Sequence, residues 1–128
     1  MNLLLDTCTF LWVIIKAEEL SLRAEKLIAD TGNRVFLSPV SSWEISVKYS
    51  LGKLPLPEEP KEYIPFQRKQ HGIESFPLDE KAVLLHPSLP NHHKDPFDRL
   101  LVCQAIAHGL SIMTPDRLIM QYPVPVVW

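Results

Sequence analysis

The sequence predicts an α/β fold of three layers, with helices on both faces of a central, mainly parallel sheet of four to five strands. Short apolar runs without the 3.6-residue period of a surface helix indicate strands that are buried on both faces. These runs alternate with longer segments that begin at capping residues and end at glycine, as helices do. Such alternation favours right-handed crossovers in a parallel sheet, and a chain of 128 residues suits one domain, residues 1–128.

The first third of the chain predicts two strands and two helices. Three consecutive leucines within residues 2–6 lack helical spacing and indicate the first strand. The uninterrupted apolar segment 7–16 is then best explained as a helix. Ser21 is placed to cap a second helix that ends at Gly32. Residues 34–38 predict the second strand.

A third helix is predicted after Pro39. The run from Ser41 to Glu44 has the S-x-x-E spacing of a capping box, which would place the start of the helix at Ser41. An apolar stripe continues along this helix until Gly52 and predicts its buried face. The stripe consists of Trp43, Val47 and Leu51.

The middle of the chain is less regular. Residues 53–60 contain three prolines and predict a loop. A helix over 61–70 should be kinked or shortened by Pro65, because proline removes a backbone donor and clashes with the preceding turn. Residues 73–78 predict the third strand, and Asp79 should cap a short helix through Val83 and Leu85.

The clearest helix signal follows the polar loop 87–94. Asp95 is placed as the N-cap, Pro96 at the first helical position and Asp98 two residues later, and the apolar pattern stops at Gly109. Two further strands are expected over 110–113 and 124–128, with a turn at 114–116 between them.

Four acidic residues fall at one edge of the predicted sheet. In a parallel sheet the strand carboxyl ends and the helix N-termini share the edge where ligands bind. Clustered carboxylates repel one another unless a cation neutralises them, and hard oxygen ligands suit Mg²⁺ or Mn²⁺. Such an ion would activate water against a phosphodiester. The acids are Asp6 after the first strand, Glu44 after the second, Asp98 before the fourth and Asp116 after it.

Each acid also has a purely structural interpretation. Glu44 could be the reciprocal half of the capping box, and Asp95 could be only an N-cap. Asp98 and Asp116 could merely complement helix dipoles or cap turns. Asp6 is different, because an acid directly after a buried leucine run needs a partner or a metal. The shared position of the four favours a functional role over four separate structural ones.

Basic and polar side chains near the acids are candidates for binding an RNA substrate. The net charge of −2 gives no basic excess, so contacts with nucleic acid must be local. The pair His92 and His93 is more typical of a solvated loop than of a metal site, since no other histidine has ligand spacing to it, although it could still touch phosphate. The candidate substrate-binding residues are Thr7, His93, Lys94, Arg99 and Thr114.

Cysteines, tryptophans and the N-terminus carry less functional information. Cys8 and Cys103 form no CxxC pair and are expected to be core thiols in a reducing compartment. The three tryptophans lie in apolar stretches and are expected in the core or in a dimer interface. The first residues lack the basic region of a signal peptide, and no apolar run approaches the ~20 residues of a membrane span. We therefore expect a cytoplasmic protein without a membrane segment.

At these residues the chain resembles the PIN-domain family, and within it the VapC-like toxins of toxin–antitoxin pairs. The likeness covers nearly the whole length, in matching order and spacing, and HHKDPFDRLL is its most specific motif. Cys8 departs from the small residue or histidine usual at that position. The motifs are LLLDT with a following LW, then S-x-WEI, then LP-x-HHKDPFDRLL-x-x-QA, then TPD followed by YPVPVVW.

The resemblance implies a metal-dependent ribonuclease in which Asp6, Glu44, Asp98 and Asp116 are the catalytic, metal-binding quartet. Asp95 matches the extra acid of the DPFDR subgroup and would reach the metal through water. Family members are usually homodimers held inactive by a small cognate antitoxin, and many cleave structured RNAs such as tRNA. The alternative is a catalytically idle PIN-like module that binds RNA or protein. The complete set of acids argues against it.

Two other enzyme or signalling classes also place an acid after the first strand. An aspartyl-phosphate phosphatase needs a second acid two residues after Asp6, where this chain has Cys8. A phospho-receiver domain needs paired acids after the first strand and a phosphoacceptor after the third, and residues 73–79 lack that arrangement. Neither class fits the residues.

Overall fold

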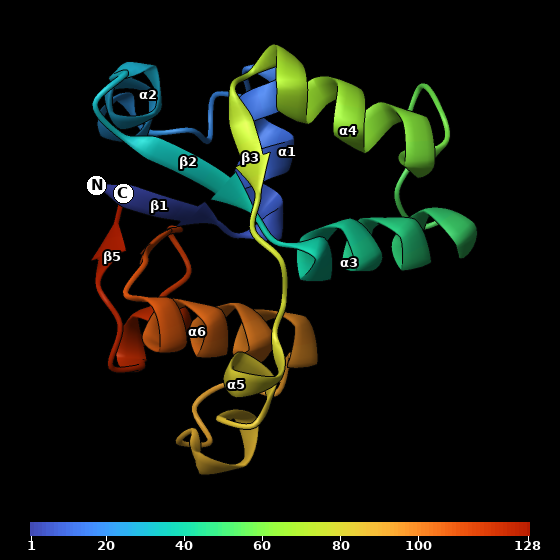
Figure 1. The fold of residues 1–128 in the computed structure, drawn as a ribbon. Helices are drawn as coiled ribbons and strands as arrows, with labels where there is room; N and C mark the ends of the chain where they lie inside the picture. The colour runs from blue at the N-terminus through green and yellow to red at the C-terminus, as the bar shows by residue number, and fades with distance from the viewer.

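The computed structural model describes residues 1–128 as a five-stranded sheet flanked by helices (Figure 1). The strand order is β3-β2-β1-β4-β5, and every neighbouring pair is parallel. The predicted α/β class and the parallel sheet are therefore confirmed. The strands are β1 (Asn2–Leu5), β2 (Arg34–Leu37), β3 (Ile73–Ser75), β4 (Ser111–Met113) and β5 (Val126–Val127).

The helices cover both faces of the sheet, as predicted. In Figure 1, α5 and α6 lie on one side of the strands, and α1, α2 and α4 lie on the other. No helix is both long and apolar enough to cross a bilayer. The helices are α1 (Thr7–Ile15), α2 (Leu22–Ala29), α3 (Pro39–Ser50), α4 (Pro60–Gln70), α5 (Glu80–Val83) and α6 (Pro96–His108), with short 3₁₀ turns at His86–Ser88 and Ile119–Gln121.

Alternate residues of the central strand supply the two halves of the core. Leu4 packs with α6 side chains such as Leu101, while Leu3 and Leu5 pack on the opposite face with Phe10 of α1. All five of these side chains are fully buried. Because successive side chains of a strand point to opposite faces, the uninterrupted leucine run is what a strand between two helical layers requires.

The order of the strands creates a crevice beside β1. The chain moves outward from β1 to β2 and β3, then returns through α5 and α6 to pair β4 with the other side of β1. Ligands of parallel sheets bind where the strand order reverses, at the carboxyl ends of the strands. Asp6 directly follows β1, and Asp116 follows β4. The topology thus brings two of the predicted acids to this crevice.

The predicted capping box at the start of α3 is wrong. The helix begins three residues earlier, with Pro39 as its first residue and Ser38 as its N-cap, and the Ser38 hydroxyl accepts the Val40 N–H at 3.0 Å. Proline is favoured at the first helical position because its missing N–H is not needed there, so Ser38 rather than Ser41 becomes the cap. Glu44 consequently lies in the second turn instead of the first.

The face of α3 that is buried also differs from the prediction. Trp43 and Leu51 are 56% and 62% exposed, so the apolar stripe mostly faces outward. The buried face carries Val40, Ser41, Glu44 and Ile45. Ser41 and Glu44 on this face turn toward the crevice. Because these buried residues are polar, hydrophobic periodicity alone predicts the wrong face. Of the other tryptophans, Trp12 and Trp128 are half-buried and their rings lie 5.8 Å apart.

Several helices and strands end at other residues than the sequence predicts, and most of these differences have a local cause. The helix α2 stops at Ala29 rather than near Gly32, because the Asp30 carboxylate accepts the Gly32 N–H at 2.9 Å in a local turn. The helix α4 runs through Pro65 and is not shortened. The strands β3 and β5 are shorter than expected, since the prolines at 77, 123 and 125 cannot donate to a ladder.

Candidate active site

Five carboxylates line one pocket of about 300 Å³ at the carboxyl edge of the sheet. They come from four separate parts of the chain, and all four acids predicted from the sequence are among them, together with Asp95. Lys48 is the one cationic side chain in the lining. The lining residues are Asp6, Thr7, Cys8, Trp12, Glu44, Lys48, Asp95, Asp98, Pro115 and Asp116.

Asp6 is buried, and both of its carboxylate oxygens have partners. Oδ1 accepts the Thr9 N–H at 2.9 Å, which makes Asp6 the N-cap of α1, and Oδ2 accepts the Thr114 hydroxyl at 2.5 Å. Burial raises the pKa of Asp6, although these hydrogen bonds oppose the effect. The predicted need for a partner is thus met by Thr9 and Thr114. The capping role was missed, although an aspartate directly before an apolar helix is itself a signal for it.

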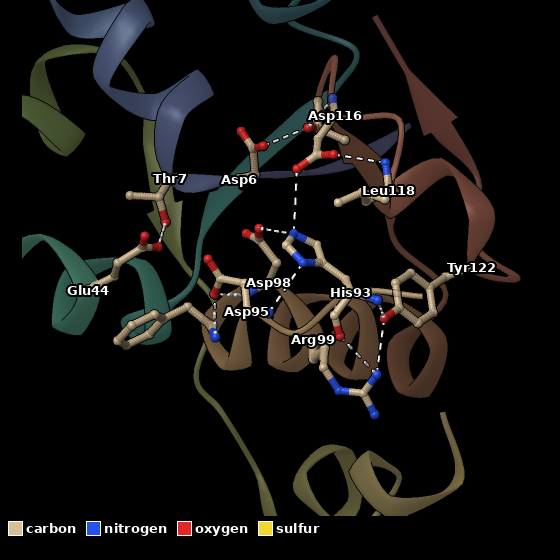
Figure 2. Close-up of polar contacts among 12 residues, drawn as sticks. Asp6, Thr7, Glu44, His93, Asp95, Asp98, Arg99, Asp116, Leu118 and Tyr122 are labelled. Atoms are coloured by element: carbon tan, nitrogen blue, oxygen red, sulfur yellow. Dashed lines mark hydrogen bonds and ion pairs between the residues drawn. The ribbon is translucent and has the colours of Figure 1, made fainter. Parts of the chain in front are cut away.

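Glu44 is held by a set of partners on the α1 and α3 side of the pocket (Figure 2). The Thr7 hydroxyl donates to Oε1 at 2.6 Å, and Lys48 Nζ lies 2.6 Å from Oε2. The Ser41 hydroxyl lies 3.0 Å from that of Thr7. The hydrogen bond to Glu44 raises the pKa of Lys48. Sequence reasoning missed Lys48, yet its spacing of four residues from Glu44 on a helix could have revealed it.

Asp95 and Asp98 share the first turn of α6, as predicted. Asp95 Oδ1 accepts the backbone N–H groups of Phe97 at 2.9 Å and of Asp98 at 3.2 Å, which confirms it as the N-cap. The pKa of Asp98 is raised to about 7 by burial and then by the negative charges of Asp95, Asp6 and Glu44, with His93 acting in the opposite direction. The site therefore crowds more negative charge than the chain itself neutralises.

Asp116 lies opposite Asp98, in the turn after β4 (Figure 2). Its Oδ1 accepts the Leu118 N–H at 2.8 Å, and its own N–H donates to the Thr114 hydroxyl at 3.0 Å. Thr114 therefore bonds to both Asp6 and Asp116. Thr7 and Thr114, expected to bind substrate, are buried with their hydroxyls committed to the acids, so the structure gives them a role in positioning carboxylates.

The interpretation of the histidine pair as a solvated loop is wrong for His93. Its side chain is only 14% exposed, and Nε2 lies 3.0 Å from Asp98 Oδ2 and 3.6 Å from Asp116 Oδ2. The ligand atoms of these three residues all lie within 4.8 Å of one another. The ring lies against two acids of the pocket, and the backbone N–H of His93 donates to Tyr122 Oη at 3.0 Å, which holds the loop in this position. Sequence spacing carries no signal for this contact with Tyr122.

Arg99 does not reach the pocket, contrary to the expectation that it contacts substrate. Its Nη1 donates to the Pro90 carbonyl at 2.9 Å and to Tyr122 Oη at 3.0 Å, and its Nη2 donates to the His86 carbonyl at 3.3 Å. The guanidinium has five donors in a rigid fork, and here they fasten the loop before α6. Lys94 is exposed at the end of that loop.

Cys8 is exposed in the pocket wall, so the prediction that it is a core thiol is wrong. It follows Thr7 at the start of α1, where the helix faces the crevice rather than the core. Partial removal from water, followed by the charges of Asp6, Glu44 and Asp98, raises the pKa of the Cys8 thiol to about 11. The thiol is therefore protonated at neutral pH. Cys103 is buried and free, as expected.

The donor set fits a divalent cation of the Mg²⁺ or Mn²⁺ type. Five carboxylates face a single lysine in the lining, and Asp98 would keep a proton near neutral pH without further positive charge. Hard oxygen ligands are those that Mg²⁺ and Mn²⁺ prefer. The residues on which such an ion would depend most are Asp6, Asp98 and Asp116, because Glu44 is already paired with Lys48.

Comparison with known proteins identifies a family and a curated relative for this chain. The PIN domain family model matches residues 3–123. A curated relative, Ribonuclease VapC16 of Mycobacterium tuberculosis (strain ATCC 25618 / H37Rv), is 38% identical over 53 residues, which are 41% of this chain and only 38% of that protein. The match therefore spans well under half of the relative.

Solved structures of low sequence identity share the fold over almost the whole chain. A chain of the DNA-bound VapBC2 complex of Rickettsia felis has a TM-score of 0.74 at 17% identity, covering 99% of this chain and 98% of that one. A chain of DNA-bound VapBC from Salmonella typhimurium has a TM-score of 0.72 at 18% identity, covering 99% and 97%. Because the PIN domain model matches nearly the full length of this chain, the chain belongs to the PIN domain family.

Proposed function

We propose that the protein is an endoribonuclease that depends on Mg²⁺ or Mn²⁺ and hydrolyses phosphodiester bonds in RNA. The observation that carries the proposal is the pocket itself, in which five carboxylates from four parts of the chain surround a space of about 300 Å³ beside one lysine. Such a concentration of negative charge repels an RNA phosphate unless a cation mediates the contact. A relative is named a ribonuclease, which supports this choice of substrate.

In the proposed site, Asp6, Asp98 and Asp116 would hold the ion, and Asp95 would reach it through water. The bound ion supplies an activated water and stabilises the leaving oxygen. Thr114 keeps the carboxylate of Asp6 and the backbone of Asp116 in place through its hydrogen bonds to both residues.

Glu44 and Lys48 have a complementary role in the proposed reaction. Glu44 is the fourth acid, and its Oε2 lies 2.6 Å from Lys48 Nζ. This contact holds the ammonium group at the pocket wall. There Lys48 would attract the substrate phosphate and offset part of the negative charge of the acids.

The direct test is cleavage of a labelled RNA by the purified chain with Mg²⁺, with Mn²⁺ and with EDTA. We expect cleavage only with the ions, and a loss of at least 100-fold in Asp98→Asn, since a group acting on the transition state is removed. Asp30→Asn is the matched control, because Asp30 lies outside the pocket lining. RNA that is bound but not cut under all conditions would favour the idle binding module instead.

We further propose that the protein is the toxin of a toxin–antitoxin pair, acts in the cytoplasm as a homodimer and is inhibited by a small cognate antitoxin. Support comes from the VapC name of the relative and from the VapBC complexes among the structural neighbours. Expression of the wild type should arrest growth, co-expression of a small neighbouring gene should relieve the arrest, and Asp98→Asn should be harmless. Normal growth with active protein present would count against the proposal.

A further inference from the structure

The two ring nitrogens of His93 face different partners (Figure 2). The backbone N–H of Asp95 donates to Nδ1 at 3.2 Å, while Nε2 points at the carboxylates of Asp98 and Asp116, at 3.0 and 3.6 Å. In a neutral imidazole, one nitrogen accepts and the other carries the proton. Because Nδ1 accepts from an amide, the proton belongs on Nε2, and His93 is a hydrogen-bond donor aimed between two acids.

This tautomer is the wrong one for a metal ligand. A histidine that binds a metal through Nε2 carries its proton on Nδ1 and donates it to a carbonyl, a carboxylate or water. Here the atom facing Nδ1 is itself a donor, so binding through Nε2 would bring two N–H groups together. The short distances among His93, Asp98 and Asp116 therefore describe a donor hydrogen-bonded to Asp98, with Asp116 3.6 Å away, rather than three ligands.

A clamp of hydrogen bonds, most of them partly buried, holds His93 in this position. Tyr122 is buried, and its hydroxyl oxygen accepts both the His93 N–H and an Nη1 donor of Arg99, each at 3.0 Å. Arg99 also donates to the carbonyls of Pro90 and His86, which fastens the rest of the loop. The ring and the backbone of His93 are thus fixed independently, the ring by Asp95 and the backbone by Tyr122.

We propose that His93 is a positioning residue that holds Asp98 Oδ2 through a hydrogen bond from its Nε2–H group, with the same group 3.6 Å from Asp116 Oδ2 and with Tyr122 and Arg99 keeping it in place. The inference rests on the proposed function, in which these two acids bind the ion. Fixing Oδ2 of Asp98 restricts rotation of its side chain and leaves Oδ1 to bind the cation, while Asp116 is already fixed through Oδ1 by the Leu118 N–H. His93 is in this account neither a metal ligand nor an acid or base in the reaction.

Nitrogen NMR of histidine-labelled wild-type protein tests the hydrogen-bond part without any substitution. We expect His93 to show the Nε2–H tautomer in the metal-free protein and to keep it after Mg²⁺ is added. The Nδ1–H tautomer, or loss of the Nε2 proton when Mg²⁺ is added, would overturn the assignment in favour of a ligand.

Metal affinity of variants tests the positioning part. We expect His93→Ala and Tyr122→Phe each to weaken Mn²⁺ binding about 10-fold, the lower end of the range for residues that orient metal ligands. The matched controls His71→Ala and Tyr49→Phe should bind Mn²⁺ like the wild type, because neither side chain hydrogen-bonds to an acid of the pocket or to His93.

Metal selectivity separates a positioning residue from a nitrogen ligand. Imidazole favours Co²⁺ over Mg²⁺, whereas carboxylates suit Mg²⁺ and Mn²⁺. A positioning role therefore predicts that both substitutions weaken Mg²⁺ and Co²⁺ binding by the same factor, and a selective loss of Co²⁺ binding would overturn it. Unchanged affinity in both variants would overturn only the role of His93. A wild-type protein that binds no divalent ion would instead overturn the proposed function on which that role rests.

Discussion

Replacing Asp98 by asparagine should make the metal-free protein more stable at neutral and alkaline pH. The pKa of Asp98 is raised from 3.8 to about 7, chiefly by burial and then by neighbouring carboxylates. Between these two values the folded protein binds more protons at Asp98 than the unfolded chain does. The free energy of unfolding of the wild type should therefore fall as the pH rises through this window, and should level off above pH 7.

The size of the effect follows from the pKa. A displacement of one pH unit corresponds to about 1.4 kcal/mol, so ionised Asp98 destabilises the fold by up to about 4 kcal/mol at pH 8. Asparagine has a similar shape and no charge, and it should recover much of this energy. Near pH 4 the carboxyl group of folded Asp98 is already protonated, and the two proteins should have similar stabilities there.

Urea denaturation in EDTA between pH 4 and pH 8 measures this prediction, with Asp30→Asn as the control for loss of an acid outside the pocket. Saturating Mg²⁺ should then stabilise the wild type at pH 8 far more than Asp98→Asn, since binding to the folded state raises its stability. Parallel pH profiles for wild type and Asp98→Asn in EDTA would contradict this prediction, because they would show that crowding of carboxylates does not destabilise the folded protein.

Three further predictions concern the core, the end of α6 and the lysine of the pocket. Leu4→Ala should lower the free energy of unfolding by about 2–5 kcal/mol, because Leu4 is fully buried against α6. A loss below about 1 kcal/mol by urea titration would contradict the packing of Leu4 in the core. Gly109→Ala should cost about 1 kcal/mol, because Gly109 ends α6 at a φ of 66°; equal denaturation midpoints would contradict this. Lys48→Met should raise the KM for RNA more than it lowers kcat if Lys48 attracts phosphate, and steady-state kinetics showing the reverse would assign Lys48 to the chemical step instead.

The parts of the fold that could be predicted depend on local chemistry. Three leucines without helical spacing identified β1, and the sequence Asp95, Pro96 and Gly109 identified both ends of α6. Each of these signals is a backbone requirement met by a neighbouring residue. The convergence of the acids was also predictable, because parallel topology alone brings strand ends and helix starts to one edge.

Most of the errors arose where contacts between residues distant in sequence decide the structure. The choice between Ser38 and Ser41 as the cap of α3 followed from Pro39, but the buried face of that helix followed from the pocket that Ser41 and Glu44 help to build. His93 enters the site because Tyr122, 29 residues away, binds its backbone. Hydropathy and spacing contain no trace of such a contact.

The location of the bound ion is the most direct test of the central claim that these carboxylates form a cation site. Crystals soaked in Mn²⁺ would reveal the ion by its anomalous scattering. We expect a peak among the carboxylate oxygens of Asp6, Asp98 and Asp116, with His93 hydrogen-bonded to an acid rather than coordinated to the ion. A pocket that stays free of anomalous density at millimolar Mn²⁺, or an ion bound on another surface, would contradict it.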